Sequence, residues 1–330
     1  MARTVFEVTA EDWPNFRFAH SALFETMQAA RTMRRPERWQ LHQPWLARVD
    51  QAAVLAEIPL LNALNPASKP AWVPDFLAPP PRREGLISIE DDLAVVAAYP
   101  PRLVRRDVER SIASQADPAT AAVLEPVLRS PIRGLRRIVA ELRIAWQELA
   151  EPFWPAITRV VGEDIGYRTR LISRHGWRGM LADLHPNVSS SASAVVVNVN
   201  IKVRIPLGGR GLLLLPSVFM SSNPAIIHEP PWPPALLYPA RGVGNLWAAP
   251  AAPPDALAGL IGTSRARLLL DLDEARSTRV ISTRHQLSPA TTSVHLKRLA
   301  AAGLVASSRV GKEVRYRRTE LAAALIAGSS

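Results

Sequence analysis

The 330-residue sequence contains no cysteine. It therefore cannot form a disulfide bond, a thiolate metal site or a cysteine nucleophile. Residues 1–12 lack the apolar core of a secretory signal. The most apolar segment, residues 211–227, is interrupted by two prolines and several polar residues, so it does not predict a membrane-spanning helix. We expect a soluble, cytoplasmic protein with no membrane partner.

Lysine is scarce as well: nearly all of the 40 lysine and arginine residues are arginine. Abundant arginine, alanine and proline are also typical of a GC-rich coding bias, which can account for part of the charge. The formal net charge of +11 favours an anionic partner, either nucleic acid or an anionic membrane surface. With 48% apolar and 21% charged residues, the composition is that of a globular protein, and the length suggests two domains.

Residues 19–185 carry mainly helical patterns, in which apolar side chains recur every three or four positions. Ser88 precedes three acidic residues, which predicts a helix N-terminus at that point. Pro100 and Pro101 end this helix and begin the next. Helices are expected at residues 22–33, 37–63, 88–98, 103–113, 132–150 and 156–174, with a short one ending near residue 184.

The period of the pattern changes at Val195. From Val195 to Ile205 every odd position is apolar and β-branched, whereas the later even positions are polar. This alternation predicts one half-buried antiparallel strand. Further strands are expected at residues 212–215, 225–228, 236–238 and 246–247. The predicted fold class is α+β, with a large N-terminal helical domain that includes a small antiparallel sheet.

All nine tryptophans lie within the first 247 residues. Residues 248–254, which are alanine and proline only, then predict an extended linker. We expect it to join an N-terminal domain, residues 1–247, to a second domain, residues 255–330. From Pro254 on, ten arginines, two lysines and six acidic residues give a net charge of +6. Since the longer N-terminal part holds less net charge, mutational bias alone does not explain the distribution.

The second domain begins with helices expected at residues 255–261, 265–272, 279–285 and 289–302. Ser288 suits a side-chain cap and Pro289 the first helical position of the last of these, while Gly303 suits the residue after its end. At about 100° per residue, Thr292, Leu296 and Leu299 share the face that packs on the core. The opposite face carries small side chains, hydroxyls and cations, which suits a DNA major groove.

A β-hairpin follows, with strands expected at residues 306–310 and 313–318 and a tight turn at Gly311. Val314 and Tyr316 alternate with arginines, so one hairpin face should pack and the other should lie along a phosphate backbone. His295 fits either a phosphate contact or a partly buried packing role. The residues predicted to contact DNA are Ser288, Ala290, Thr291, Ser293, Val294, His295, Lys297, Arg298, Arg309, Lys312, Arg315 and Arg317.

The run from Leu287 to Val305, with its Ser-x-His-Leu-x-x-Leu core, resembles the recognition helix of ArsR-type winged helix-turn-helix repressors. The later Arg-x-Gly-Lys-x-Val-x-Tyr run, residues 309–316, resembles the wing of that family. The N-terminal part resembles a domain of unknown function that precedes such winged helices in actinobacterial regulators. That similarity is carried by residues 181–187, 209–217 and 238–242 and assigns no activity.

The resemblance implies a homodimer that binds a pseudo-palindromic double-stranded DNA operator and regulates transcription, in the manner of a repressor. It also implies that the helices at residues 255–261 and 321–326 form the dimer surface. Metal-sensing members use cysteine, or histidine and acidic residues on the last helix. This chain has no cysteine and no histidine after His295, so neither a metal nor another cofactor is expected.

Other functions stay open for the N-terminal domain. It can sense a small molecule, serve as a structural platform, or be an enzyme or protein-docking module that the winged helix tethers to DNA. His185 with Asn187, and His228 with Glu229, can form polar sites but are more typical of helix and turn caps. Residues 208–211 lack the lysine of a phosphate-binding loop. Because no catalytic motif is present, we do not expect an enzyme. Nonspecific chromatin-type binding is a weaker alternative.

Overall fold

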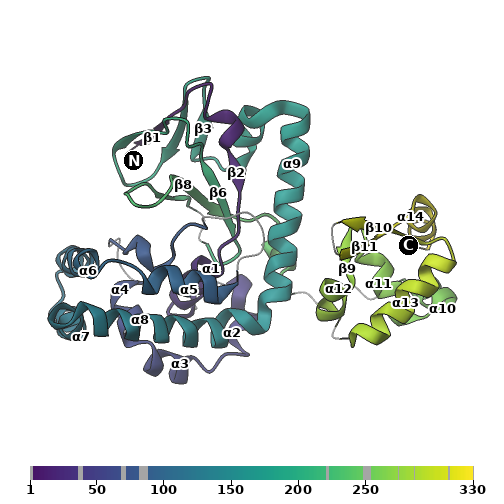
Figure 1. Ribbon diagram of the computed structural model, residues 1–330, viewed down its shortest axis with the longest axis horizontal. Coiled ribbons are helices and arrows are strands. Elements are labelled where there is room, and N and C mark those ends of the chain that lie inside the picture. Colours follow the sequence, from purple (N-terminus) through teal and green to yellow (C-terminus); the bar gives the residue numbers. More distant parts are fainter. Residues whose placement is uncertain are drawn as a thin grey trace. The chain divides into compact units, whose positions relative to one another are not determined.

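The computed structural model describes residues 3–35, 40–67, 72–81, 88–220, 223–247, 254–273, 275–285, 287–310 and 313–329. They form a mixed α+β protein with several small sheets. The chain divides into two compact units, Met1–Trp247 and Ala248–Ser330 (Figure 1). No helix in the described ranges is long and apolar enough to cross a membrane. Apart from Pro254, the expected linker lies outside the described residues.

The first unit has a layer of helices that begins at Ser21, whose hydroxyl accepts a hydrogen bond from Phe24 N. The expected single helix at residues 37–63 is wrong over residues 40–63, and residues 37–39 lie outside the described ranges. Three short helices follow one another instead: Pro44 lies in the first turn of one, Asp50 caps the next and Pro59 begins the third. The helices of the layer are α1 Ala22–Met33, α2 Gln43–Leu46, α3 Gln51–Glu57, α4 Pro59–Leu64, α5 Ile89–Ala97, α6 Pro101–Gln115, α7 Pro118–Arg129 and α8 Pro131–Ala145.

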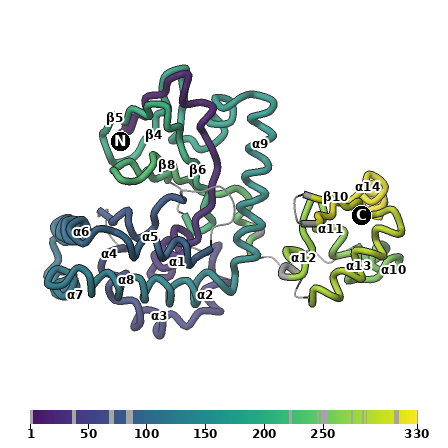
Figure 2. The backbone as a smooth tube through the Cα atoms, viewed as in Figure 1, coloured from purple at the N-terminus to yellow at the C-terminus, as the bar shows by residue number. Residues whose placement is uncertain are grey.

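Helix α7 was not predicted, although Asp117 caps it and Pro118 occupies its first position. A π-helical turn, Trp146–Ala150, and then a 3-10 turn, Glu151–Phe153, connect α8 to α9, Trp154–Leu184. Gly176, with φ of +66°, kinks α9 at the boundary between the two helices expected there. In Figures 1 and 2, α9 runs from the helical layer along the side of the sheets.

Residues 195–205, expected as one strand, contribute to two strands of a four-stranded sheet that we call the outer sheet. They form β4, Ala194–Asn198, and most of β5, Val203–Pro206, which pair with opposite edges of β1, Arg3–Glu7. With β3, Val188–Ser190, the strand order is β3-β4-β1-β5. Strand β5 runs parallel to β1, so the expected all-antiparallel sheet is also wrong. Strand β1 thus lies between strands that are almost 200 residues away in the sequence, and Figure 2 shows the path of the chain.

The inner sheet separates the two apolar cores of the first unit. Its strands are β2 Arg17–Phe18, β6 Leu213–Ser217, β7 Ala225–Ile227 and β8 Ala235–Pro239, in the order β2-β6-β8-β7. In β6, Leu213 and Leu215 face the core under the helical layer, whereas Leu214 faces a core shared with the outer sheet. The expected strand at 246–247 is wrong, since these residues follow a 3-10 turn, Val243–Asn245, and form no strand.

The second unit has its own small core, which includes Leu268, Leu296 and Leu304. Strand β9, which was not predicted, pairs with β11 and completes a three-stranded sheet in the order β10-β11-β9. The elements are α10 Asp255–Ile261, α11 Thr263–Leu270, β9 Arg276–Ser277, α12 Thr278–Arg284, α13 Pro289–Ala301, β10 Val305–Val310, β11 Glu313–Arg318 and α14 Glu320–Ala327.

Candidate nucleic-acid interface

Helix α13 is fixed at both ends. The Ser288 hydroxyl accepts a hydrogen bond of 3.1 Å from Thr291 N and lies 2.8 Å from the Thr291 hydroxyl. At the other end Gly303, with φ of +70°, reverses the chain, and Leu304 N donates to the carbonyl of Leu299. The predicted caps are therefore confirmed. Pro289 has no N–H and Thr291 N bonds Ser288, so Ala290 N is the backbone donor of the first turn that an anion at this exposed helix N-terminus can use.

The two faces of α13 lie as the sequence predicts. Thr292, Leu296 and Leu299 are buried in the core of the second unit. Ala290, Thr291, Val294, Lys297 and Arg298 are exposed, and we call these residues the α13 face. Ser288 is also exposed, whereas Ser293 and His295 are half-buried. The helix contains two cations and no acidic residue.

His295 is only partly available to a ligand. Its Nδ1 is buried and has no hydrogen-bond partner among the described residues, and the same holds for the Thr292 hydroxyl oxygen. Any contact of His295 with an anion would therefore use the other ring nitrogen. Both roles predicted for this side chain remain compatible with its position.

The hairpin of β10 and β11 places arginines on its surface. Arg309 lies opposite Val314, and Arg315 lies opposite Ser308; both arginines are exposed. Lys312 lies outside the described residues. The expected packed face is wrong at Val314, which is 43% exposed, although Tyr316 does pack against the core.

Arg317 is exposed, but it is not simply a surface cation. Its Nε donates a hydrogen bond of 3.2 Å to the carbonyl of Asp273, beyond the end of α11. The neighbouring Arg318 donates from Nη1 to the carbonyl of Leu270 at 3.4 Å. Arg318 thus bonds the last carbonyl of α11, where a cation is favourable, and Arg317 bonds the turn that follows the helix. Sequence periodicity could not reveal these partners because they belong to another element.

Acidic side chains of this unit are partly neutralised at the same place. Asp271 lies 3.8 Å from Arg276 Nε, and its other carboxylate oxygen lies 3.1 Å from His285 Nε2. Asp273 lies 3.6 Å from Arg276 Nη2. These contacts hold two carboxylates near β9.

Two leucines of the second unit are unusually exposed. Leu260 of α10 is 68% exposed, and Leu321 of α14 is 61% exposed. Both lie in the helices predicted to form a dimer surface, while Leu257 and Ala322 on the same helices are buried. Single exposed leucines are common on protein surfaces, and these two are accessible to another chain.

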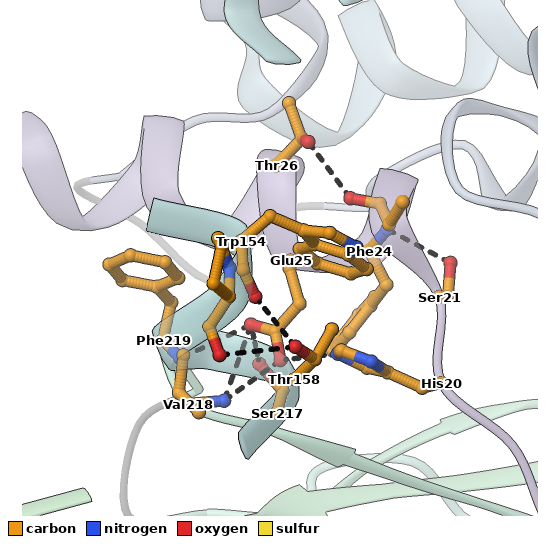
Figure 3. A network of polar contacts seen from close by, with 12 residues as sticks. His20, Ser21, Phe24, Glu25, Thr26, Trp154, Thr158, Ser217, Val218 and Phe219 are labelled. Carbon is orange, nitrogen blue, oxygen red and sulfur yellow. Dashed lines mark hydrogen bonds and ion pairs between the residues drawn. The ribbon is translucent and has the colours of Figure 1, made fainter. Parts of the chain in front are cut away.

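The first unit contains a buried carboxylate network that sequence reasoning missed (Figure 3). Glu25 accepts hydrogen bonds from Ser217 Oγ at 2.8 Å, Val218 N at 3.0 Å and Phe219 N at 3.4 Å. Its other contact is His20 Nε2, at 3.3 Å. Ser217 and Glu25 are both buried, and Ser217 donates to the carboxylate rather than to the histidine. The network fastens α1 to the end of β6, and a lone glutamate among apolar residues was its only sequence signal.

The polar pairs noted in the sequence have structural contacts. Asn187 N donates to His185 Nδ1 at 3.0 Å within a turn, and Glu229 pairs with Arg110 at 2.8 Å. The described residues include no cluster of three or more histidine or acidic side chains suited to a metal. No family model, curated protein or solved structure matches the chain. In the described part of the second unit, the α13 face and the hairpin strands carry exposed cations at Lys297, Arg298, Arg309 and Arg315.

Proposed function

We propose that the second unit is a winged helix-turn-helix domain and that the chain is a sequence-specific, homodimeric DNA-binding regulator of transcription with repressor-like action. The observation that carries the proposal is the capped helix α13, whose exposed face combines small side chains, a hydroxyl and two cations without any acid. The hairpin with exposed Arg309 and Arg315 follows directly. The resemblance of residues 287–305 to ArsR-type recognition helices supports the same function.

In this proposal α12 and α13 form the helix-turn-helix, and α13 enters the major groove. Ala290 has no long side chain, so the helix backbone can approach the base edges closely. Thr291 and Arg298 offer a hydroxyl and a guanidinium, which are donors that read bases. Ser288 and the helix N-terminus contact a phosphate and fix the register of the helix on the duplex.

The hairpin serves as the wing and contacts the phosphate backbone through Arg309, Lys312 and Arg315. Arg317 has a smaller role, because one of its N–H groups already bonds the Asp273 carbonyl. Its remaining donors can still reach a phosphate. The wing therefore contributes affinity that depends on salt rather than on sequence.

The exposed Leu260 and Leu321 favour a symmetric dimer through α10 and α14. A two-fold dimer would place two copies of α13 in successive major grooves, about 34 Å apart. The operator would then be a pseudo-palindrome. Burial of two leucines from each protomer removes apolar surface that would otherwise face water.

Selection of bound duplexes from a random DNA pool tests the proposal directly. We expect the full chain to enrich one pseudo-palindromic motif and to bind it at least about 10³-fold more tightly than random DNA. The variant Arg267→Ala removes one exposed arginine from α11 and should enrich the same motif. Equal affinity for the selected and random pools would show that the chain is not a sequence-specific regulator. A chain that stays monomeric at the concentrations that saturate the motif would contradict the dimer.

A further inference from the structure

A cavity of about 290 Å³ opens in the first unit between α1, the segment around the 3-10 turn Asp75–Leu77, and strands β7 and β8. Its walls are mainly apolar and include Phe24, Met27, Leu77, Val199, Ile227 and Leu237. An apolar cavity of roughly 150 Å³ already binds benzene. This cavity is therefore large enough for a small organic molecule with a ring or a short alkyl chain.

The wall of the cavity also carries a cation, Arg31. It follows Phe24, Met27 and Gln28 at seven, four and three positions, so all four residues share one face of α1 and line the cavity. Arg31 is half-buried and, within the described part of the chain, makes no hydrogen bond or ion pair. Burial and then the nearby Arg35 lower the pKa of Arg31, but a guanidinium remains charged in proteins. A half-buried guanidinium of this kind favours an anion.

Asp75 also lines the cavity, but the charged groups that act on its carboxyl, Glu229, Asp107 and Arg110, lie outside the lining. Burial, followed by the charges of Glu229 and Asp107, raises the pKa of Asp75 to about 7. The charge that lowers this pKa is that of Arg110. Among the described residues, Asp75 forms no ion pair with Arg31. The cavity thus offers one guanidinium, that of Arg31, beside a mainly apolar lining.

We propose that this cavity binds a small organic monocarboxylate whose apolar body fills the space between α1 and the inner sheet and whose carboxylate pairs with Arg31. A monoanion matches a single guanidinium, whereas a phosphate dianion would bring a second, uncompensated charge against apolar walls. Gln28, beside Arg31 on α1, can donate a further hydrogen bond to the carboxylate. The geometry of the cavity carries this part of the proposal, which does not depend on DNA binding.

We infer further that the ligand regulates DNA binding, and this second step rests on the proposed function. Thr32, next to Arg31, donates a hydrogen bond to the Phe219 carbonyl at 3.4 Å. The Phe219 ring lies 6.0 Å from the ring of Trp247, the last described residue before the second unit. A shift of α1 on ligand binding would therefore reach the exit of the chain through packed groups. Regulation requires that the ligand bind the DNA-competent and incompetent states with different affinities.

Calorimetric titration of the full chain with naphthoate and with octanoate tests binding, and the neutral naphthamide is the matched probe. We expect saturable binding of at least one carboxylate and markedly weaker binding of naphthamide. Arg31→Met should weaken carboxylate binding about tenfold or more, since it removes a charge-assisted pair, and should leave naphthamide binding unchanged. The control Arg35→Met, which removes a neighbouring arginine outside the cavity lining, should bind carboxylates as the parent does.

Ala225→Phe provides a second variant, because Ala225 lines the cavity and a phenyl group would fill it. This variant should keep the thermal unfolding transition of the parent while losing affinity for every probe. Absence of carboxylate binding at millimolar concentration, or equal binding by the parent and Arg31→Met, would overturn the ligand assignment. If a carboxylate binds but leaves affinity for the selected DNA motif unchanged, the regulatory step is wrong while the DNA-binding proposal stands. If no DNA motif is enriched, calorimetry still decides whether the cavity binds a carboxylate.

Discussion

The indole Nε1 of Trp247 donates a hydrogen bond of 3.0 Å to Nδ1 of His42, although 205 residues separate them in the sequence. His42 is buried and also contacts the ring of Phe219, at 4.9 Å between centroids. This pair holds the end of the first unit against its core. The bond requires an unprotonated Nδ1, so the neutral form of His42 is built into the packing.

Acid should weaken the first unit through His42. Burial lowers the pKa of His42 from 6.5 to about 4, despite an opposing hydrogen bond to the Val218 backbone. The unfolded chain binds this proton near pH 6.5 and the folded chain only near pH 4, so stability is lost as pH falls between these values, by on the order of 3 kcal/mol in full. His42→Phe should be less stable at pH 7 but should lose less stability between pH 7 and pH 5. Thermal unfolding followed by tryptophan fluorescence measures both effects.

Asp92 should make the first unit less stable as the pH rises, the opposite of the effect of His42. Burial, together with the charge of Asp91, raises the pKa of Asp92 to about 7, and its Oδ2 has no hydrogen-bond partner among the described residues. The folded chain keeps this proton up to about pH 7, whereas the unfolded chain loses it near pH 3.8, so stability falls as pH rises through this window. Asp92→Asn should stabilise the first unit at pH 8 by on the order of 1 kcal/mol or more. An equal gain from Glu125→Gln, an exposed acid on α7, would show that the effect is only one of net charge.

The cap of α13 should matter for both stability and binding. Ser288→Ala removes the acceptor for Thr291 N and should cost about 1 kcal/mol of local stability. Faster hydrogen exchange in peptides from α13, measured by mass spectrometry, reports this loss, and affinity for DNA should fall with it. Ser307→Ala, at an exposed position of β10, should leave both quantities unchanged. Unaltered exchange in Ser288→Ala would mean that the cap does not hold the helix.

Sequence readout should depend on the α13 face. Thr291→Ala or Arg298→Ala should cost about 1–3 kcal/mol on the selected motif and less on random DNA. Both side chains are exposed. The Thr291 hydroxyl also lies within hydrogen-bond distance of the Ser288 hydroxyl. Fluorescence anisotropy with matched duplexes gives the two affinities. Equal losses on both duplexes would assign these residues to phosphate contacts instead.

The hairpin cations should contribute affinity without specificity. The double variant Lys312→Ala with Arg315→Ala should weaken binding to the motif and to random DNA alike. The slope of log affinity against log salt should decrease by about one for each cation–phosphate pair that the substitutions remove. Binding isotherms at several salt concentrations provide the slope. Unchanged affinity for both duplexes would contradict the wing assignment.

Local patterns in the sequence were enough to predict α13. Its caps at Ser288 and Gly303 and its buried stripe of Thr292, Leu296 and Leu299 are confirmed. A cap bonds an amide three residues away, and a helical face repeats every three or four residues, so both depend on a short stretch of chain. For the same reason α5 begins where Ser88 predicts.

Only the tertiary structure decided how distant segments pair. The alternation from Val195 to Ile205 describes two strands as well as one, because a face period of two does not say where pairing partners change. Strand β1, from the N-terminal end of the chain, lies between β4 and β5 in the sheet and pairs with both of them. The bond between Arg317 and the Asp273 carbonyl and the place of Arg31 in the cavity wall have the same origin. Such contacts join elements far apart in the chain, so their geometry is fixed by packing and not by local propensity.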